Sequence, residues 1–522
     1  MKNVLFLSLA LSLFACKQSP QLPPIASFSE IESASIAELS QLMEEGRLTS
    51  AQLVDFYLQR IDSLDQNGPK VNSVLLVNPE AKEIAQKMDE ERSQGKVRSA
   101  MHGIPVLLKD NIDTHDQMPN TAGSIAMKGH MPKQDAGIVV PLREAGVVIL
   151  GKTNLSEWAN FRSTSSSSGW SSMLGQTGNP YQLNMTPCGS SAGSGSAVAA
   201  NFATVAIGTE TNGSIGCPSS VNGIVGIKPT VGLWSRSGII PISHTQDTPG
   251  PMARSVMDAA TFLNIGVQKD ERDPATAEVP AEKVDYTASC VEGALQGKRL
   301  GVDTAYLNLD TDVGQVFAKA VADLKAAGAE IVPLPLQSQM GGSDNADEYT
   351  LLLYEFKADL NAYLAEANAP YKTLEELIAF NKEHEEEAMP LFKQEIFEMA
   401  QEKGPLTDTA YVNASTRVLE KTRNLIHQSM EEHQLSAIVG PTTGQAWTFD
   451  LDDDDTFNGP ASYGIAAISG YPHISVPMGQ IEGLPLGLCF IGDRWMESTI
   501  IGLAYDYEQK TKHFKAPTYK LK

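Results

Sequence analysis

Residues 188–229 decide how this sequence is interpreted, and they read CGSSAGSGSAVAANFATVAIGTETNGSIGCPSSVNGIVGIKP. Two serines in this stretch, Ser190 and Ser214, are each flanked by glycine. Upstream, Lys109 follows the apolar run 104–108. A serine hydroxyl is a weak nucleophile that needs a base, and a lysine kept neutral by burial can serve as that base. The sequence therefore predicts nucleophilic catalysis by a serine with a lysine in place of histidine.

The order and spacing of these motifs resemble those of the amidase signature family. Lys109 comes first, the Gly-Ser-Ser motif follows at 189–191, and the Thr-x-x-x-Gly-Ser-Ile motif follows at 209–215. Ser190 and Ser214 are 24 residues apart, which is the family's spacing. The resemblance covers nearly the whole mature chain, and within the family the sequence looks most like the bacterial peptide amidases. Residues 228–233 and 247–252 are also similar to the family, and residues 440–443 and 470–488 support the placement among the peptide amidases.

The resemblance implies one large α/β domain over residues 29–522. We expect an α/β/α sandwich around a mixed, mostly parallel central sheet. The pattern of residues 299–333 independently predicts a β-α-β unit with two parallel strands. Residues 346–432 are strongly charged and helical in pattern, so they are predicted to form a helical insertion near the mouth of the site.

The resemblance also assigns roles to single residues. Ser214 is expected to be the nucleophile, and Lys109 the base. Ser190 is expected to relay protons between them, held by a cis peptide bond after Gly189. Ser191 is the neighbour expected to add a supporting hydrogen bond.

The turn around the nucleophile is expected to form the oxyanion hole. Thr211, Asn212, Gly213 and Ser214 can present successive backbone N–H groups to a developing negative charge. The histidines of the chain show no metal-ligand spacing, and the resemblance implies no cofactor.

One departure from the family concerns the substrate. Some members carry an arginine two residues after the nucleophile, where this chain has Gly216. An arginine there would offer a site for a carboxylate. Its replacement favours an uncharged substrate, such as the C-terminal carboxamide of a peptide or a small neutral amide.

Three other functions remain open at this stage. Residues 189–193 match the G-x-S-x-G nucleophile elbow, which would make the chain an α/β-hydrolase-type esterase acting through Ser191 and His473. An elbow follows a buried strand, however, and residues 178–187 have the composition of a loop. The chain also resembles one component of a tRNA-dependent amidotransferase, and a lipoprotein that binds peptides without turnover is a further alternative.

A fourth pattern suggests a nucleotide site and is judged accidental. Residues 146–153 match the phosphate-loop pattern, with Lys152 as its lysine. The intervening residues 147–150 are apolar and strand-like, so the first glycine precedes the strand instead of following it. We therefore expect a helix-leading turn at 151–154 and no bound phosphate.

The composition excludes one class of partner. The 522 residues carry a formal net charge of −23 and are 42% hydrophobic. Phosphate binding needs clustered lysine and arginine, so a nucleic-acid partner is not expected.

The N-terminal residues are typical of export. Lys2 is followed by the apolar run 4–14, which is too short to span a bilayer, and then by Cys16. The pattern resembles a bacterial lipoprotein box, which implies a signal peptide at 1–15, lipidation of Cys16 and a tether at 16–28. An ordinary signal peptide is the alternative. We expect a membrane-anchored protein that faces the periplasm or the cell exterior.

Two further cysteines accompany the serine motifs. Cys188 and Cys217 each lie within three residues of a predicted catalytic serine. If the serines meet in space, the thiols can lie close together and pair in an oxidising compartment. Separate small buried side chains are the preferred interpretation.

Overall fold

The fold is built on a large mixed sheet. The computed structural model describes residues 25–451, 457 and 459–521, so the predicted signal peptide and Cys16 lie outside the described residues. Eleven strands form the main sheet in the order β1-β3-β2-β6-β8-β7-β12-β13-β11-β9-β10, and β4 and β5 form a small hairpin. The strands are β1 (Val74–Val77), β2 (Pro105–Lys109), β3 (Val148–Thr153), β4 (Trp170–Ser171), β5 (Gly175–Gln176), β6 (Val205–Glu210), β7 (Val225–Lys228), β8 (Thr248–Ala253), β9 (Arg299–Asp303), β10 (Glu330–Leu334), β11 (Ala437–Pro441), β12 (His473–Ile481) and β13 (Leu484–Ile491).

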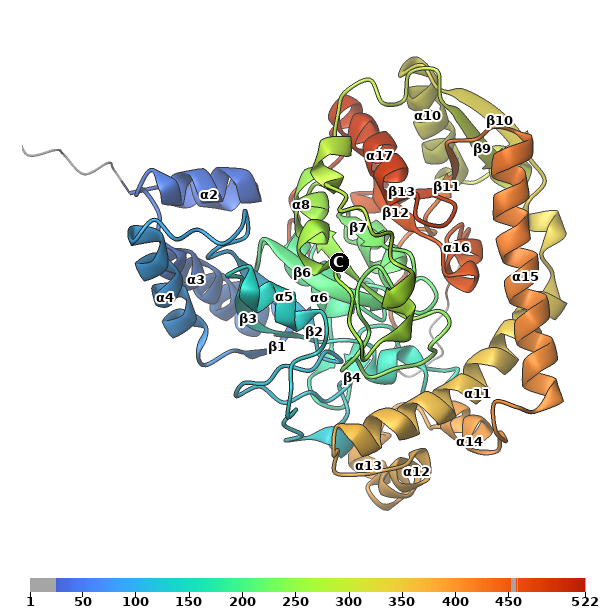
Figure 1. The fold of residues 1–522 in the computed structure, drawn as a ribbon, viewed down its shortest axis with the longest axis horizontal. Coiled ribbons are helices and arrows are strands. Elements are labelled where there is room, and N and C mark those ends of the chain that lie inside the picture. The colour runs from blue at the N-terminus through green and yellow to red at the C-terminus, as the bar shows by residue number, and fades with distance from the viewer. Residues whose placement is uncertain (1–24, 452–456, 458, 522) are drawn as a thin grey trace, which may run out of the picture.

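Helices cover both faces of this sheet (Figure 1). α6 and α7 contact each other and the central strands, whereas α8 and α17 contact each other and β7, β8, β12 and β13. The α-helices are α1 (Phe28–Ser33), α2 (Ile36–Glu44), α3 (Ser50–Arg60), α4 (Ala81–Ser93), α5 (Val139–Glu144), α6 (Ala192–Ala199), α7 (Gly216–Val221), α8 (Val256–Gly266), α9 (Thr304–Leu307), α10 (Asp312–Ala326), α11 (Gly342–Glu366), α12 (Leu374–Glu383), α13 (Glu385–Ala388), α14 (Glu395–Gln401), α15 (Thr409–Glu432), α16 (Gly464–Ser469) and α17 (Glu497–Thr511). A π-helix at Ile61–Gln66 continues α3, and 3₁₀ turns lie at Ile125–Met127, Glu157–Asn160, Pro274–Glu278, Tyr286–Ser289 and Gln337–Gln339.

The α/β architecture with a mixed sheet is confirmed, but the expectation that parallel pairing prevails is wrong. Of the ten strand pairings in the main sheet, four are parallel: β2 with β3 and β6, and β9 with β10 and β11. The other six are antiparallel. The physical reason is that β12 and β13 are joined by a two-residue turn at 482–483, which permits only antiparallel pairing, and β8 runs antiparallel between β6 and β7.

Parallel strands place the site. β2 lies between β3 and β6 and is parallel to both, so all three end at the same edge of the sheet. The apolar residues 104–108 are buried in the core, and Lys109 is the last residue of β2. The chain then leaves the sheet at the edge where β6 also ends.

The charged region predicted as a helical insertion consists of α11 to α15. It packs around a second hydrophobic cluster with Trp158 and Phe161 of the main body, together with Phe356, Leu360 and Phe397. In Figure 1, α11 to α14 lie in the lower part of the molecule, and α15 runs up its right side past α16. The insertion is therefore packed on the core and is not a separate unit. Within the described part of the chain, no helix has the length and apolar composition needed to cross a bilayer.

Candidate active site

Lys109 lies fully buried at the end of β2. Burial lowers the pKa of its amine to about 7, although the carboxylates of Asp247 and Glu210 act to raise it. A large share of the amine is therefore neutral near pH 7. Such an amine has a lone pair with which to accept a proton.

Three oxygen atoms surround the Lys109 amine. Nζ lies 2.7 Å from Ser190 Oγ, 2.8 Å from Thr209 Oγ1 and 3.2 Å from the Thr209 carbonyl oxygen. Asn111 Nδ2 also donates to Thr209 Oγ1, at 3.0 Å. A neutral amine can donate its two N–H groups to Thr209 and direct its lone pair at Ser190. The sequence motifs assign no role to Thr209 or Asn111, and only the structure shows that both belong to this arrangement.

Ser190 lies in the loop that leads into α6, and the peptide bond between Gly189 and Ser190 is cis. The Ser190 carbonyl accepts a hydrogen bond from Ser156 N at 3.1 Å. A Cβ at position 189 would lie 2.2 Å from Ser156 Oγ, so any larger residue would displace the Ser156 side chain. The loop is thus fixed by backbone contacts with the segment after β3.

Ser191 ties the two serine loops together. Its N–H donates to the Ser214 carbonyl at 3.2 Å, and its hydroxyl both donates to Thr209 O and accepts from Thr209 N. The side chain is fully buried. Ser191 therefore has the supporting position expected of it, and its hydroxyl has no approach for a substrate.

Ser214 lies in the turn that connects β6 to α7. Gly213 adopts φ +83°, and a Cβ there would clash with the Tyr463 ring. Within the described part of the chain, the N–H groups of Asn212, Gly213 and Ser214 have no hydrogen-bond acceptor in the protein. They are therefore available to an oxygen atom brought into the cavity beside them.

Side chains from distant segments hold this turn. Asn212 Nδ2 donates to Glu348 Oε1 at 2.7 Å, and Thr211 Oγ1 donates to Asp247 Oδ1 at 2.5 Å. Glu348 belongs to α11, so the helical insertion contacts the turn directly. The sequence carried no signal for this contact, because the two residues lie 136 positions apart.

A buried ion pair fixes the residues after Ser214. Glu210 Oε2 accepts from the N–H groups of Ile215 and Gly216, at 2.8 and 2.9 Å, and Oε1 lies 2.8 Å from His473 Nε2. Burial opposes ionisation of Glu210, but His473, the charge of Lys228 and the Gly216 N–H together outweigh it and hold the pKa of the carboxyl at about 2. His473 is thus engaged with Glu210, and the elbow-type esterase arrangement with Ser191 is not formed.

The two cysteines beside the serines form a disulfide. Cys188 and Cys217 are linked, with Cα atoms 5.9 Å apart, so the preference for separate thiols is wrong. The reason is spatial: the loop before α6 and the first turn of α7 meet because the two serines do. Cys290 and Cys489 are free and buried.

Ser190, Ser214 and the turn residues 211–213 line one cavity of about 300 Å³. The disulfide forms part of its wall, and aromatic and aliphatic side chains form much of the rest. No described residue that lines it is charged. The remaining lining residues are Ala159, Asn160, Phe161, Thr164, Ser166, Ser168, Gly189, Ile242, Leu352, Trp447, Phe457 and Tyr463.

The segment that matches the phosphate-loop pattern lies away from this cavity. Lys152 is fully buried inside β3, where its amine donates to the Ile112 carbonyl, and β3 continues through Thr153. The phosphate-loop match is therefore accidental, as expected, but the helix-leading turn predicted at 151–154 is wrong because the strand extends into it.

One group of side chains in the described residues has the composition of a metal site. His244, Glu355 and Asp359 gather their ligand atoms within 4.8 Å. His244 Nδ1 lies 2.9 Å from Asp359 and Nε2 lies 3.4 Å from Glu355, so each ring nitrogen already faces a carboxylate. Burial lowers the pKa of His244, but the hydrogen bond to Asp359 and the charges of Glu355 and Asp359 together outweigh it, and the net shift is upward. An ion pair accounts for the group.

Comparison with known proteins assigns the family. Residues 52–501 match the family model described as Amidase. The chain belongs to the amidase family. This amidase is 39% identical over 506 residues to a probable amidase of Arabidopsis thaliana, covering 95% of this chain and 93% of the relative. It is 31% identical over 510 residues to a component of the glutamyl-tRNA(Gln) amidotransferase of Thermoanaerobacter pseudethanolicus, covering 94% of this chain and 98% of that component.

Solved structures agree with the predicted placement among the peptide amidases. The amidase is similar to the native peptide amidase of Stenotrophomonas maltophilia, with 48% identity, a TM-score of 0.89, and coverage of 94% of this chain and 99% of that one. A peptide amidase in complex with the competitive inhibitor chymostatin gives 48% identity, a TM-score of 0.88, and coverage of 93% and 99%. The amidase-signature fold and the likeness to peptide amidases are thus confirmed.

Proposed function

We propose that this amidase hydrolyses the C-terminal carboxamide of peptides through an acyl-serine intermediate, with Ser214 as nucleophile, Ser190 as proton relay and Lys109 as base. The carrying observation is the contact between the buried Lys109 amine and Ser190 Oγ at 2.7 Å. Both serines line one uncharged cavity, which suits a neutral carboxamide. The likeness to peptide amidases supports the substrate class.

In the first half-reaction the proton of Ser214 passes to Ser190 while the proton of Ser190 passes to the neutral Lys109 amine. Ser214 Oγ bonds to the amide carbon, and the oxyanion is held by backbone N–H groups of residues 212–214. The C–N bond then breaks. The proton returns from Lys109 through Ser190 to the nitrogen, which leaves as ammonia.

In the second half-reaction water attacks the ester carbonyl. Its proton follows the same route to Lys109 and then returns to Ser214 as the C–O bond breaks. The products are the peptide acid and free Ser214, and the two half-reactions require water but no cofactor.

The test is ammonia release by a soluble form that lacks residues 1–16. Amidated peptides and small aliphatic and aromatic amides are offered to the wild type, to Ser214→Ala and to Lys109→Ala. We expect release from the peptide amides, lost in both variants. Release from small amides alone would mean that the substrates are small amides instead of peptide amides. No release from any amide would leave a peptide-binding protein without turnover.

The esterase alternative has its own control in this experiment. Ser191→Ala should reduce activity through loss of the Thr209 contacts without abolishing it. Complete loss in Ser191→Ala with activity kept in Lys109→Ala would favour the esterase.

A lipid anchor on Cys16 stays a prediction, together with its consequence that the protein faces the periplasm or cell exterior. Expression of the full chain in bacteria supplied with a labelled fatty acid tests it. Label should enter the wild type and be absent from Cys16→Ala. Equal labelling of both would contradict the anchor.

A further inference from the structure

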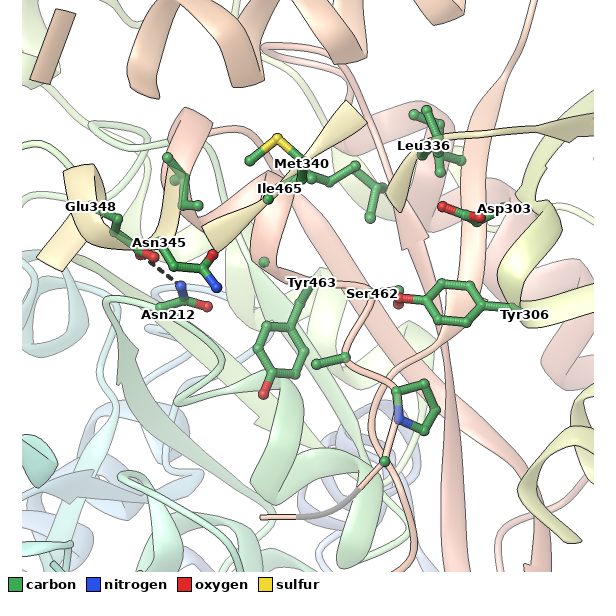
Figure 2. Close-up of a pocket in the computed structure, with 18 of the residues that line it drawn as sticks. Asn212, Asp303, Tyr306, Leu336, Met340, Asn345, Glu348, Ser462, Tyr463 and Ile465 are labelled. Atoms are coloured by element: carbon green, nitrogen blue, oxygen red, sulfur yellow. Dashed lines mark hydrogen bonds between the residues drawn. The ribbon is translucent and has the colours of Figure 1, made fainter. Parts of the chain in front are cut away.

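A second, larger cavity adjoins the serine cavity. It measures about 650 Å³ and lies between the first turns of α11, the segment before α16, and the ends of β9 and β11. Asn212 and Tyr463 line both cavities, so the two are neighbours at the turn that carries Ser214. Figure 2 shows Asn212 and Glu348 at one end of the larger cavity, and Asp303 and Tyr306 at the other.

The leaving group decides what this cavity can hold. Hydrolysis of a primary carboxamide releases ammonia, which needs almost no room. All the bulk of the substrate is therefore on the acyl side. A cavity of this size falls in the range that binds small organic ligands, so the acyl portion is its natural occupant.

The charged residues in the described lining of the larger cavity are all acidic. Its described charged residues are Glu348 and Asp303, and no lysine, arginine or histidine is among them. Apolar side chains such as Met340, Ile465 and Leu336 form much of the remaining wall. A carboxylate in an apolar wall attracts a cation and repels an anion more strongly than one in water does.

Of the two carboxylates that line the larger cavity, Glu348 is the one that is hydrogen-bonded to the turn carrying Ser214. The residue is 9% exposed, and Oε1 accepts from both Asn212 Nδ2 and Gln246 Nε2, at 2.7 and 3.0 Å. Oε2 has no hydrogen-bond partner among the described residues. Burial raises the pKa of Glu348, and the hydrogen bonds from Gln246 and Asn212 act to lower it. A cation in the cavity would favour the ionised form, which accepts hydrogen bonds at both oxygens, so Oε2 has capacity for a donor there.

We propose that this cavity selects acyl portions that carry a cationic nitrogen, either the α-ammonium of a short peptide amide or a lysine or arginine side chain, and that Glu348 determines this selectivity. The inference rests on the proposed peptide-amide hydrolysis and adds its substrate class. Peptides with acidic side chains upstream of the carboxamide are disfavoured, since their carboxylates would face Glu348 without a counter-charge.

The experiment compares kcat/KM for tripeptide amides that differ at one upstream residue: lysine, norleucine or glutamate. Each peptide is used with a free and with an acetylated N-terminus, which separates the α-ammonium from the side-chain ammonium as the source of the cation. The variant is Glu348→Gln, whose amide oxygen can still accept from Asn212 and Gln246. The matched control is Asp347→Asn, which removes the same charge one residue away, where Asp347 pairs with Arg417 instead of lining the cavity.

We expect the wild type to prefer at least one cationic form over its neutral counterpart by roughly tenfold, a preference that Glu348→Gln removes and Asp347→Asn keeps. In Glu348→Gln, kcat/KM for the preferred cationic peptide should fall roughly tenfold more than kcat/KM for the neutral acetylated norleucine peptide.

Parallel loss on all substrates would mean that Glu348 only positions Asn212, and would overturn the proposal. An unchanged preference in Glu348→Gln, or the same loss in Asp347→Asn, would overturn it as well. These results differ from failure of the proposed function, in which the wild type releases no ammonia from any of the peptides and both inferences fall together.

Discussion

Lys109 Nζ and Ser190 Oγ lie 2.7 Å apart, although the two residues are separated by 81 positions in the chain. The contact forms because β2 and β6 are parallel neighbours, so the lysine that ends β2 lies beside Thr209 near the end of β6. The loop that carries Ser190 is bonded to the segment after β3 on the other side. One sheet edge thus assembles a base and a hydroxyl that the sequence keeps far apart.

The pH dependence of the activity should follow the Lys109 amine. Its pKa is lowered to about 7, and only the neutral form, present above that pKa, can accept the serine proton. With a peptide amide that has no titratable group, kcat/KM should rise as pH increases through about 7 and then level off. A profile that is flat from pH 5 to 9 would contradict a lysine base.

Thr209 should act by orienting the Lys109 amine. Thr209→Val removes the hydroxyl that lies 2.8 Å from Nζ and leaves the carbonyl in place, so kcat/KM should fall by roughly tenfold with little change in fold. Thr204→Val is the control, because Thr204 lies just before β6 and its hydroxyl contacts Tyr57 instead. Equal effects of the two substitutions would show a general loss of strand stability.

Glu210 should be important for folding stability. Glu210→Gln breaks a buried pair with His473 and should lower the free energy of unfolding by about 3 kcal/mol, measured by urea denaturation at pH 7. Because the pKa of the carboxyl is lowered to about 2, its contribution is complete above pH 4.5 and is lost as pH falls through 2. The double variant with His473→Gln should lose much less free energy of unfolding than the two single variants together. Losses that simply add would show that Glu210 and His473 do not stabilise each other.

The number of free thiols should be two. The soluble form lacking residues 1–16, denatured without reductant, should expose only Cys290 and Cys489 to a thiol reagent, because Cys188 and Cys217 are joined. Reduction should raise the number to four, and Cys188→Ser should give three without reduction. Four free thiols in the unreduced wild type would exclude the disulfide.

Local patterns predicted much of the fold. The pattern of residues 299–333 predicted the parallel pair β9 and β10, which is confirmed. The start of α6 could not be recognised from local composition, because the helix begins at Ala192 within a run of glycine and serine. Glycine and serine there have low helix propensity, but Gly193 permits a close approach to backbone atoms of Ser73 and Asn154 that outweighs it.

The site was predictable where its residues lie in motifs, and hidden where it depends on tertiary contacts. Ser190, Ser214 and Lys109 are brought to one region as predicted, while their roles stay proposals. The contribution of Glu348 could not be read from the sequence, because a glutamate in a charged helix has no local feature that distinguishes it from its solvent-facing neighbours. The pairing of Cys188 with Cys217 depends in the same way on two loops meeting in space.

Helix α11 has a consequence for how new substrate ranges arise in this scaffold. Glu348 near its start holds Asn212, Glu355 in its middle accepts from Ser243, and Tyr363 near its end donates to Asp113. Helix α11, which lines the larger cavity, is thereby hydrogen-bonded at three points to loops near Lys109 and Ser214. A chimera that takes residues 342–432 from another amidase therefore also needs matching residues at the three contact positions. Selection for a new substrate in this scaffold acts on the substrate cavity and on the catalytic loops together.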